Sequence, residues 1–168
     1  MSLKSMMARG TVLLAAAGKM MQTLQVRLTA GEVKDSVEHF EPYGFTSNPL
    51  SGAEVLTMFL SGDRSHAVVV VAADRRYRIK ELKPGEVAIY TDEGDKVHFK
   101  RGRIIDIETN TLNIKAATAV NFDTPVINQT GKIVSTGDQI AGGVSQIEHV
   151  HTNVQAGSGN SGPPAAGA

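Results

Sequence analysis

Apolar or weakly polar side chains occupy every second position in one long segment of the chain. The segment runs from Leu112 to Val126, and the residues between them are mostly Asn, Lys, Ala and Asp. Successive side chains of an extended strand lie on opposite faces, so this segment would carry one continuous apolar face. A strand of this length exceeds the usual five or six residues of strands in globular proteins.

Something must cover that apolar face, and the second half of the chain shows no amphipathic helical pattern that could do so. An isolated strand system is not stable in water. Self-association solves the problem if three copies wind together and each supplies one wall of a shared apolar interior. Burial of a Val or Ile side chain contributes roughly 1.5–3 kcal/mol. The segment therefore predicts an intertwined β-structure built from three chains.

Short strand patterns separated by turn residues fill the chain from Thr11 to about Lys100. The run from Val68 to Val71 is apolar throughout, which favours a central strand with neither face exposed. Five or six antiparallel strands over this length fit a small closed or half-closed barrel, such as the five-stranded OB-fold. Residues 33–49 would form a bent strand or a single turn followed by a rigid loop. The expected strands are 11–17, 24–28, 53–60, 66–73, 87–90 and 97–99.

The beginning of the chain has a superficial likeness to a secretory signal peptide, because Lys4 and Arg9 precede an apolar run over residues 11–17. That run has only the minimum length for a signal peptide, and Arg9 and Gly10 directly adjoin it. A first strand is the favoured interpretation. No stretch approaches the ~18 apolar residues of a membrane-spanning helix.

Composition argues against several classes of function. The 17 basic and 17 acidic residues give zero formal net charge, and aromatic residues make up only 5%. A dedicated nucleic-acid-binding protein usually has a basic surplus and aromatic residues that stack on bases. The absence of Cys excludes disulfides, thiolate metal sites and a Cys nucleophile. The alternative of an OB-fold module that binds nucleic acid or protein has its best support in Arg75, Arg76, Tyr77, Arg78 and Lys80.

Two histidines near the end of the sequence, His149 and His151, are candidate metal ligands. In an extended segment both side chains lie on the same side, with Val150 on the other. No His, Cys, Asp or Glu follows His151, so further ligands come from upstream or from other copies of the chain. Metalloenzymes with this motif have a carboxylate and more histidines downstream, so we expect no enzyme. The other histidines, His39, His66 and His98, are expected to make ordinary hydrogen bonds in the barrel.

Several motifs distributed along nearly the whole sequence are shared with a known family. The motifs are His39–Asn48, Gly62–His66, Asp74–Tyr77, Thr124–Val126, Gly131–Ile133, Thr136–Asp138, Ala141–Gly143, His149–His151, Val154–Gln155 and Gly162–Pro164. Together they resemble the baseplate spike proteins of contractile-tailed phages of the Mu and P2 types.

This resemblance implies a homotrimer with an OB-fold domain in residues 1–96, an intertwined triple-stranded β-helix in 97–145 and a tip in 146–168. It implies one iron ion on the three-fold axis, bound by His149 and His151 of each chain, and it allows further axial ions such as calcium or chloride. The implied protein is a structural part of the virion tail baseplate that docks on tail-tube and hub proteins. It would pierce the host outer membrane during tail contraction, without binding nucleic acid.

The chemistry of the histidine pair agrees with that implication. Three copies of two imidazoles give six nitrogen ligands, the number that an octahedral site requires. Structural Zn²⁺ prefers four tetrahedral ligands, so six histidines point to Fe(II), with Ni or Co able to bind in vitro. A filled coordination shell leaves no position for substrate, so the metal would be structural. Its binding should weaken when acid protonates the imidazoles.

Overall fold

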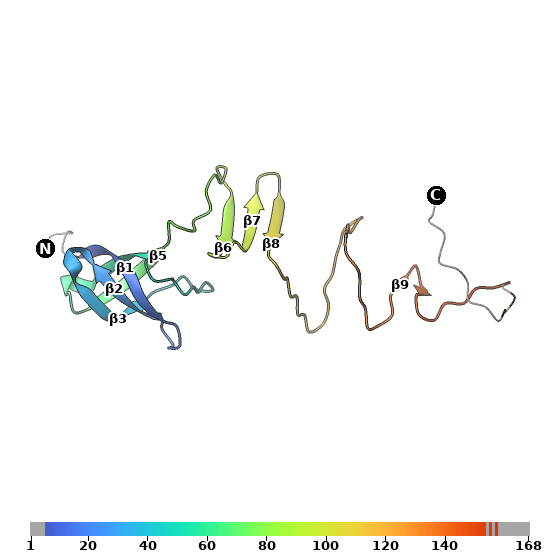
Figure 1. The fold of residues 1–168 in the computed structure, drawn as a ribbon, viewed down its shortest axis with the longest axis horizontal. Coiled ribbons are helices and arrows are strands. Elements are labelled where there is room, and N and C mark those ends of the chain that lie inside the picture. The colour runs from blue at the N-terminus through green and yellow to red at the C-terminus, as the bar shows by residue number, and fades with distance from the viewer. Residues whose placement is uncertain (1–5, 154, 156, 158–168) are drawn as a thin grey trace. The chain divides into compact units, whose positions relative to one another are not determined.

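The computed structural model describes residues 6–153, 155 and 157, and its regular elements there are β-strands and short 3-10 turns (Figure 1). No α-helix occurs in these residues, so the predicted all-β class is confirmed. None of them forms a helix long and apolar enough to cross a membrane. The chain divides into two compact units, Met1–Ile114 and Lys115–Ala168. The predicted domain limits at 96 and 145 stay predictions.

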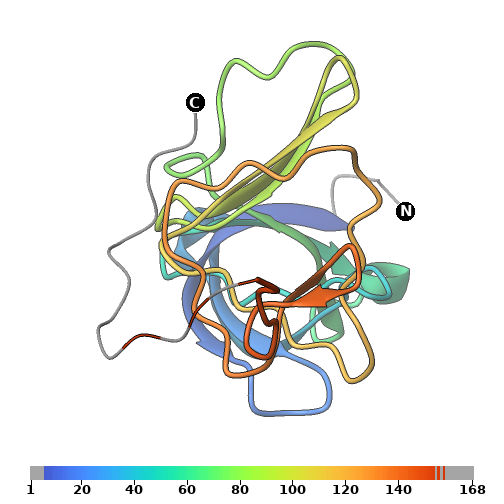
Figure 2. The same cartoon turned by 90° about the vertical axis from the view of Figure 1, so that its right-hand side faces the viewer.

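Five strands close into a barrel in the first unit, and Figure 2 shows them curving around one another. Their order around the barrel is β1-β2-β3-β5-β4, and β1 also pairs with β4. The predicted small closed barrel is confirmed, but one expectation is wrong: β3 and β5 pair in parallel, not antiparallel. The strands are β1 (Met7–Ala16), β2 (Thr23–Leu28), β3 (Val33–His39), β4 (Glu54–Phe59) and β5 (Ala67–Ala73).

The barrel interior holds the fully buried apolar side chains. Alternation places them there: Leu24, Val26 and Leu28 of β2 are buried while the residues between them are more exposed. In the part of the chain that the structure describes, every buried apolar side chain lies between Val12 and Val69. The nine that form the core are Val12, Leu24, Val26, Leu28, Val37, Ala53, Val55, Phe59 and Val69.

The first expected strand, 11–17, overlaps β1 over residues 11–16, so the strand interpretation of this segment is confirmed. Residues 33–39 are the expected bent strand, with Ser36 at a φ of 53°. The fifth strand is central, between β3 and β4, but the expectation that it has no exposed face is wrong. Val70 and Val71 are exposed, because Leu56 pairs with Val71 and Thr57 with Val69, which leaves Val70 in a bulge.

Gly10 lies in β1 where the strand pairs with Leu28 on one side and Val55 on the other. A Cβ at this position would come within 2.5 Å of the Arg27 carbonyl oxygen. We expect Gly10→Ala to lower the free energy of unfolding by about 1–3 kcal/mol through overpacking. Gly18→Ala is the control, because no heavy atom lies within 4 Å of its Cβ position. Thermal denaturation that shows equal midpoints for the two variants would contradict this account.

Three further strands form a separate antiparallel sheet in the order β6-β7-β8. They are β6 (Val87–Tyr90), β7 (Lys96–Lys100) and β8 (Ile104–Glu108). The expected strands at 87–90 and 97–99 are therefore present. They belong to this second sheet, however, and not to the barrel that the sequence pattern assigned them to. The barrel is already closed by β1 pairing with β4, so it has no free edge to accept them.

The second unit contains little regular structure within one chain. Residues 109–139 include no strand, so the long strand expected over 112–126 is absent from the isolated chain. A short hairpin follows, made of β9 (Ile140–Ala141) and β10 (Val144–Ser145). Its turn is Gly142–Gly143, with φ values of 59° and 84°, the positive values that two-residue hairpin turns require. Of the predicted tip, Val154 and Gly162–Pro164 lie outside the described residues.

Candidate metal site and exposed apolar faces

His149 and His151 lie next to one another after the β9–β10 hairpin. Their ring centroids are 5.1 Å apart and the ring planes are inclined by 80°. Both side chains are exposed to solvent in the single chain. The structure thus brings the two predicted ligands together on one side of the backbone.

One nitrogen of His149 is already engaged: Nδ1 lies 2.8 Å from the carbonyl oxygen of Ser145. A carbonyl oxygen only accepts, so Nδ1 carries the proton and the Nε2 lone pair is free in the neutral ring. Neutral imidazole suits Fe, Ni, Cu and Zn. The donor set therefore fits a metal site, although one chain does not complete it. Within the described residues no group of three or more His, Cys, Asp or Glu side chains could hold a metal ion.

Two of the remaining histidines make the ordinary hydrogen bonds expected of them. His39 is buried in the barrel, with Nδ1 3.0 Å from Oε1 of Gln22. Burial lowers the pKa of His39 below its ordinary value. His98, in the second sheet, lies with Nε2 3.2 Å from Oε2 of Glu86. Neither histidine is near a second candidate ligand cluster in the described part of the chain.

The β6-β7-β8 sheet has one apolar face and one charged face. Directly paired residues of antiparallel strands share a face. Val87 pairs with Phe99 and Phe99 with Ile105, while Ile89 pairs with Val97 and Val97 with Ile107. We call these six residues the apolar sheet face: Val87, Ile89, Val97, Phe99, Ile105 and Ile107. None of them is fully buried, and Ile105 is 58% exposed.

The opposite side of the same sheet is rich in ion pairs. Lys96 Nζ lies 2.6 Å from a carboxylate oxygen of Glu108, and Lys100 pairs with Asp106. Hydrogen bonding and charge from Lys100 hold the pKa of Asp106 below its ordinary value. A sheet with one face charged and one apolar normally has the apolar face packed on a core. In this chain the described residues provide no such core.

The same absence of cover continues along the chain beyond β8. Leu112, Ile114, Val120, Phe122 and Val126 are all exposed in the single chain. Among the residues that the structure describes, no backbone-to-backbone hydrogen bond involves residues 109–138. Water can satisfy exposed backbone groups, but a contiguous exposed apolar patch is characteristic of an interaction surface. This segment and the apolar sheet face are therefore candidate interaction surfaces.

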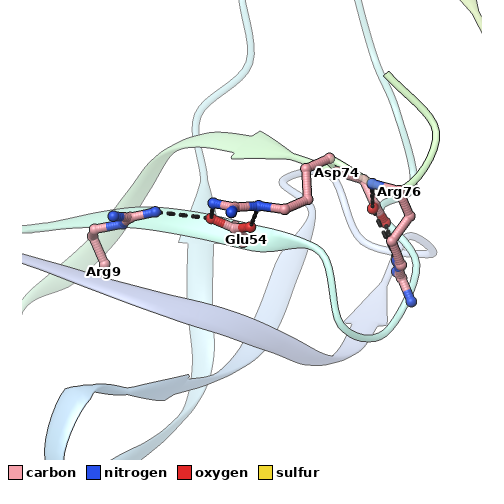
Figure 3. A network of polar contacts seen from close by, with 5 residues as sticks. Arg9, Glu54, Asp74 and Arg76 are labelled. Carbon is pink, nitrogen blue, oxygen red and sulfur yellow. Dashed lines mark hydrogen bonds and ion pairs between the residues drawn. The ribbon is translucent and has the colours of Figure 1, made fainter. Parts of the chain in front are cut away.

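Two of the four cations in the basic run that follows β5, Arg75 and Arg76, are paired with carboxylates (Figure 3). Glu54 accepts hydrogen bonds from Arg9 at 2.9 Å and from Arg75 at 2.8 Å. Arg76 pairs with Asp74 and donates to the Ser51 carbonyl at 3.0 Å. The hydrogen bond with Arg75, assisted by Arg9, keeps the pKa of Glu54 below its ordinary value. These arginines tie the ends of β1, β4 and β5 together instead of forming an open basic groove, which argues against the nucleic-acid-binding alternative.

Comparison with known proteins identifies the family of this chain. Residues 9–76 match the family described as Bacteriophage Mu Gp45, N-terminal. The chain is 34% identical over 164 residues to the baseplate puncturing device gp45 of Escherichia phage Mu, covering 87% of this chain and 83% of the relative. The chain belongs to the Mu gp45 family. A second member is the Mu-like prophage FluMu protein gp45 of Haemophilus influenzae, 36% identical over 142 residues and 77% of each chain.

Family membership confirms the resemblance read from the sequence motifs. The matched family region, residues 9–76, extends from β1 to just beyond β5, the last strand of the barrel. The sequence interpretation missed the apolar sheet face, since β8 was not expected and β6 and β7 were assigned to the barrel. A signal for it existed: Val87 and Ile89, Val97 and Phe99, and Ile105 and Ile107 each alternate with polar or small residues.

Proposed function

We propose that this Mu gp45 family member is a trimeric spike of a contractile phage tail that pierces the host outer membrane. The observation that carries the proposal is the apolar β-structure without cover from Val87 onward. The described part of the chain buries no apolar side chain completely beyond Val69. A chain that forms only the barrel core by itself needs copies of itself to form the rest.

Three copies satisfy the geometry. Three sheets arranged around an axis turn their apolar faces, from Val87 to Ile107, toward one another and their ion pairs toward solvent. The backbone of residues 109–139 then finds its hydrogen-bond partners in neighbouring copies, and the alternate apolar residues from Leu112 to Val126 fill the interior. Closed packing of this kind leaves no free strand edge, which prevents further aggregation.

A spike of this kind works mechanically. Interchain pairing along the whole second half gives stiffness, and no chemical reaction is required, so we assign no enzymatic activity. The name baseplate puncturing device, given to the phage Mu relative, supports a place in the tail baseplate of the virion. The barrel would then dock on tail-tube or hub proteins, and the opposite end would meet the host outer membrane.

The metal belongs to the same proposal. His149 and His151 of three copies would supply six imidazole nitrogens to one Fe(II) on the three-fold axis, with no coordination position left for a substrate. Iron bound there joins three chain segments near their ends, and its binding free energy adds to the stability of the assembly. The function of the ion is structural.

Light scattering of the full chain tests the proposal directly. We expect a particle with three times the 17.8 kDa chain mass. The trimer should also run as such on a gel in sodium dodecyl sulfate without boiling, because interwound strands separate slowly. A monomer in solution would refute the proposal.

A further inference from the structure

A network of hydrogen bonds surrounds the candidate ligand His149, and nothing in the proposed function so far uses it. It begins with the β9–β10 hairpin, in which Ser145 pairs with Ile140. The hairpin ladder continues one step further, because Gln146 N donates to the Gln139 carbonyl at 3.0 Å. The chain then turns sharply through residues 146–148 to reach His149.

Asp138 and Ser145 hold this turn through its backbone. One Asp138 oxygen, Oδ1, accepts from the N–H groups of Gln146 at 3.0 Å and Ile147 at 3.2 Å. Ser145 Oγ accepts from Ile147 N at 3.1 Å and from Glu148 N at 2.7 Å. Three consecutive backbone donors therefore have side-chain acceptors, which fixes the path of the chain into His149.

The acceptor at the centre of the network is charged. A hydrogen bond from the Ser145 side chain, with those from the backbone N–H groups of Ile147 and Gln146, holds the pKa of Asp138 below its ordinary value. Asp138 is thus a carboxylate at neutral pH. Hydrogen bonds to an ionised acceptor are roughly twice as strong as those between neutral groups. The turn is therefore held by charge-assisted hydrogen bonds to Asp138 and by hydrogen bonds to Ser145.

The final hydrogen bond of the network is made by the His149 imidazole. His149 Nδ1 donates to the Ser145 carbonyl at 2.8 Å, so the residue whose hydroxyl fixes the turn also orients the ring. A metal-bound histidine commonly donates its other ring N–H to a carbonyl or carboxylate, which sets the tautomer and the ring direction. Here that partner is in place within one chain.

We propose that Asp138 and Ser145 are positioning residues that present His149 to the metal through Nε2. This inference rests on the proposed metal site and adds to it the chain's own means of orienting the ring. The orientation is set within each copy, before three copies meet. The Ser145 carbonyl fixes the tautomer, and the Asp138 carboxylate fixes the carbonyl by holding the turn around it.

The first test measures iron binding by full-length trimers refolded in solutions of Fe²⁺ buffered by a competing chelator. Loss of such outer partners typically costs 10–100-fold in metal affinity. We expect Asp138→Ala and Ser145→Ala each to raise the free Fe²⁺ concentration for half-loading by about that factor. Asp138→Asn, which keeps an acceptor oxygen but not its charge, should recover part of the loss. Asp123→Ala, an exposed aspartate of the same unit, should load like the wild type.

The second test measures the tautomer of the His149 ring directly. Nitrogen NMR of metal-free trimer labelled at histidine should show His149 protonated at Nδ1, and a mixture of tautomers in Asp138→Ala and Ser145→Ala. Half-loading and tautomer equal to the wild type in both alanine variants would overturn the positioning role while leaving the iron site intact. A wild-type trimer that takes up no Fe²⁺ would refute the metal site, and the positioning role with it.

Discussion

Ile105→Lys is expected to convert the trimer into monomers. Ile105 lies on the apolar sheet face in the edge strand β8, pairs with Phe99 of the middle strand β7, and is 58% exposed in a single chain. In a trimer three copies of this residue would face one another, so the substitution would bury three ammonium groups without partners. Such an uncompensated charge costs several kcal/mol even after relaxation. Light scattering at a fixed protein concentration measures the outcome.

The neighbouring residue provides a matched control. Ile104 is the same type of residue and is 52% exposed, but it pairs with Lys100 on the charged face of the sheet. Ile104→Lys should therefore leave the trimer intact. Two variants that behave alike, both trimeric or both monomeric, would show that the two faces of the sheet are not distinguished as we propose.

Most of the barrel could be predicted from the sequence because its signals are local. Leu24, Val26 and Leu28 alternate with polar residues, and all three are buried in the barrel. Turn residues mark where the strands end. What the local pattern could not give was pairing between distant strands: the parallel contact of β3 with β5, and the bulge that exposes Val70, depend on closure of the whole barrel.

For the second half of the chain, the alternation pattern alone could not predict the structure of a single copy. Alternation from Leu112 to Val126 predicts an apolar face, yet a single chain forms no strand there. A strand is defined by hydrogen bonds to a neighbour, and in the proposed trimer that neighbour is another copy of the chain. The periodicity of the sequence predicts which side chains share a face, but it does not identify the strand that pairs with this segment.

The candidate site was predictable in part for the same reason. The spacing of His149 and His151 suffices to place both rings on one side. The Asp138 and Ser145 contacts were not predictable, since they run from side chains to backbone N–H groups around a turn whose path no residue pattern specifies. The one local signal in this region is the pair Gly142–Gly143, which indicates a tight hairpin turn before the histidines.

Replacing both histidines by alanine should remove the iron completely. We expect about one Fe per three wild-type chains, the ratio that six imidazole ligands around one ion require, and none in the double variant His149→Ala with His151→Ala. The trimer should persist, because the apolar surfaces that hold it begin at Val87 and both histidines are exposed beyond them. Elemental analysis of purified trimer measures the ratio.

The control and the contrary result separate metal binding from assembly. His66→Ala removes an exposed histidine of the barrel unit and should keep the full iron content. Iron retained by the double variant would refute the assignment of the ligands. The tip would then owe its stability to the apolar contacts alone. Loss of both iron and trimer would instead make the metal a condition of assembly, and the apolar faces alone insufficient. In the proposed spike, the apolar surfaces from Val87 onward assemble the trimer, and the metal ion then stabilises the segment that contains His149 and His151.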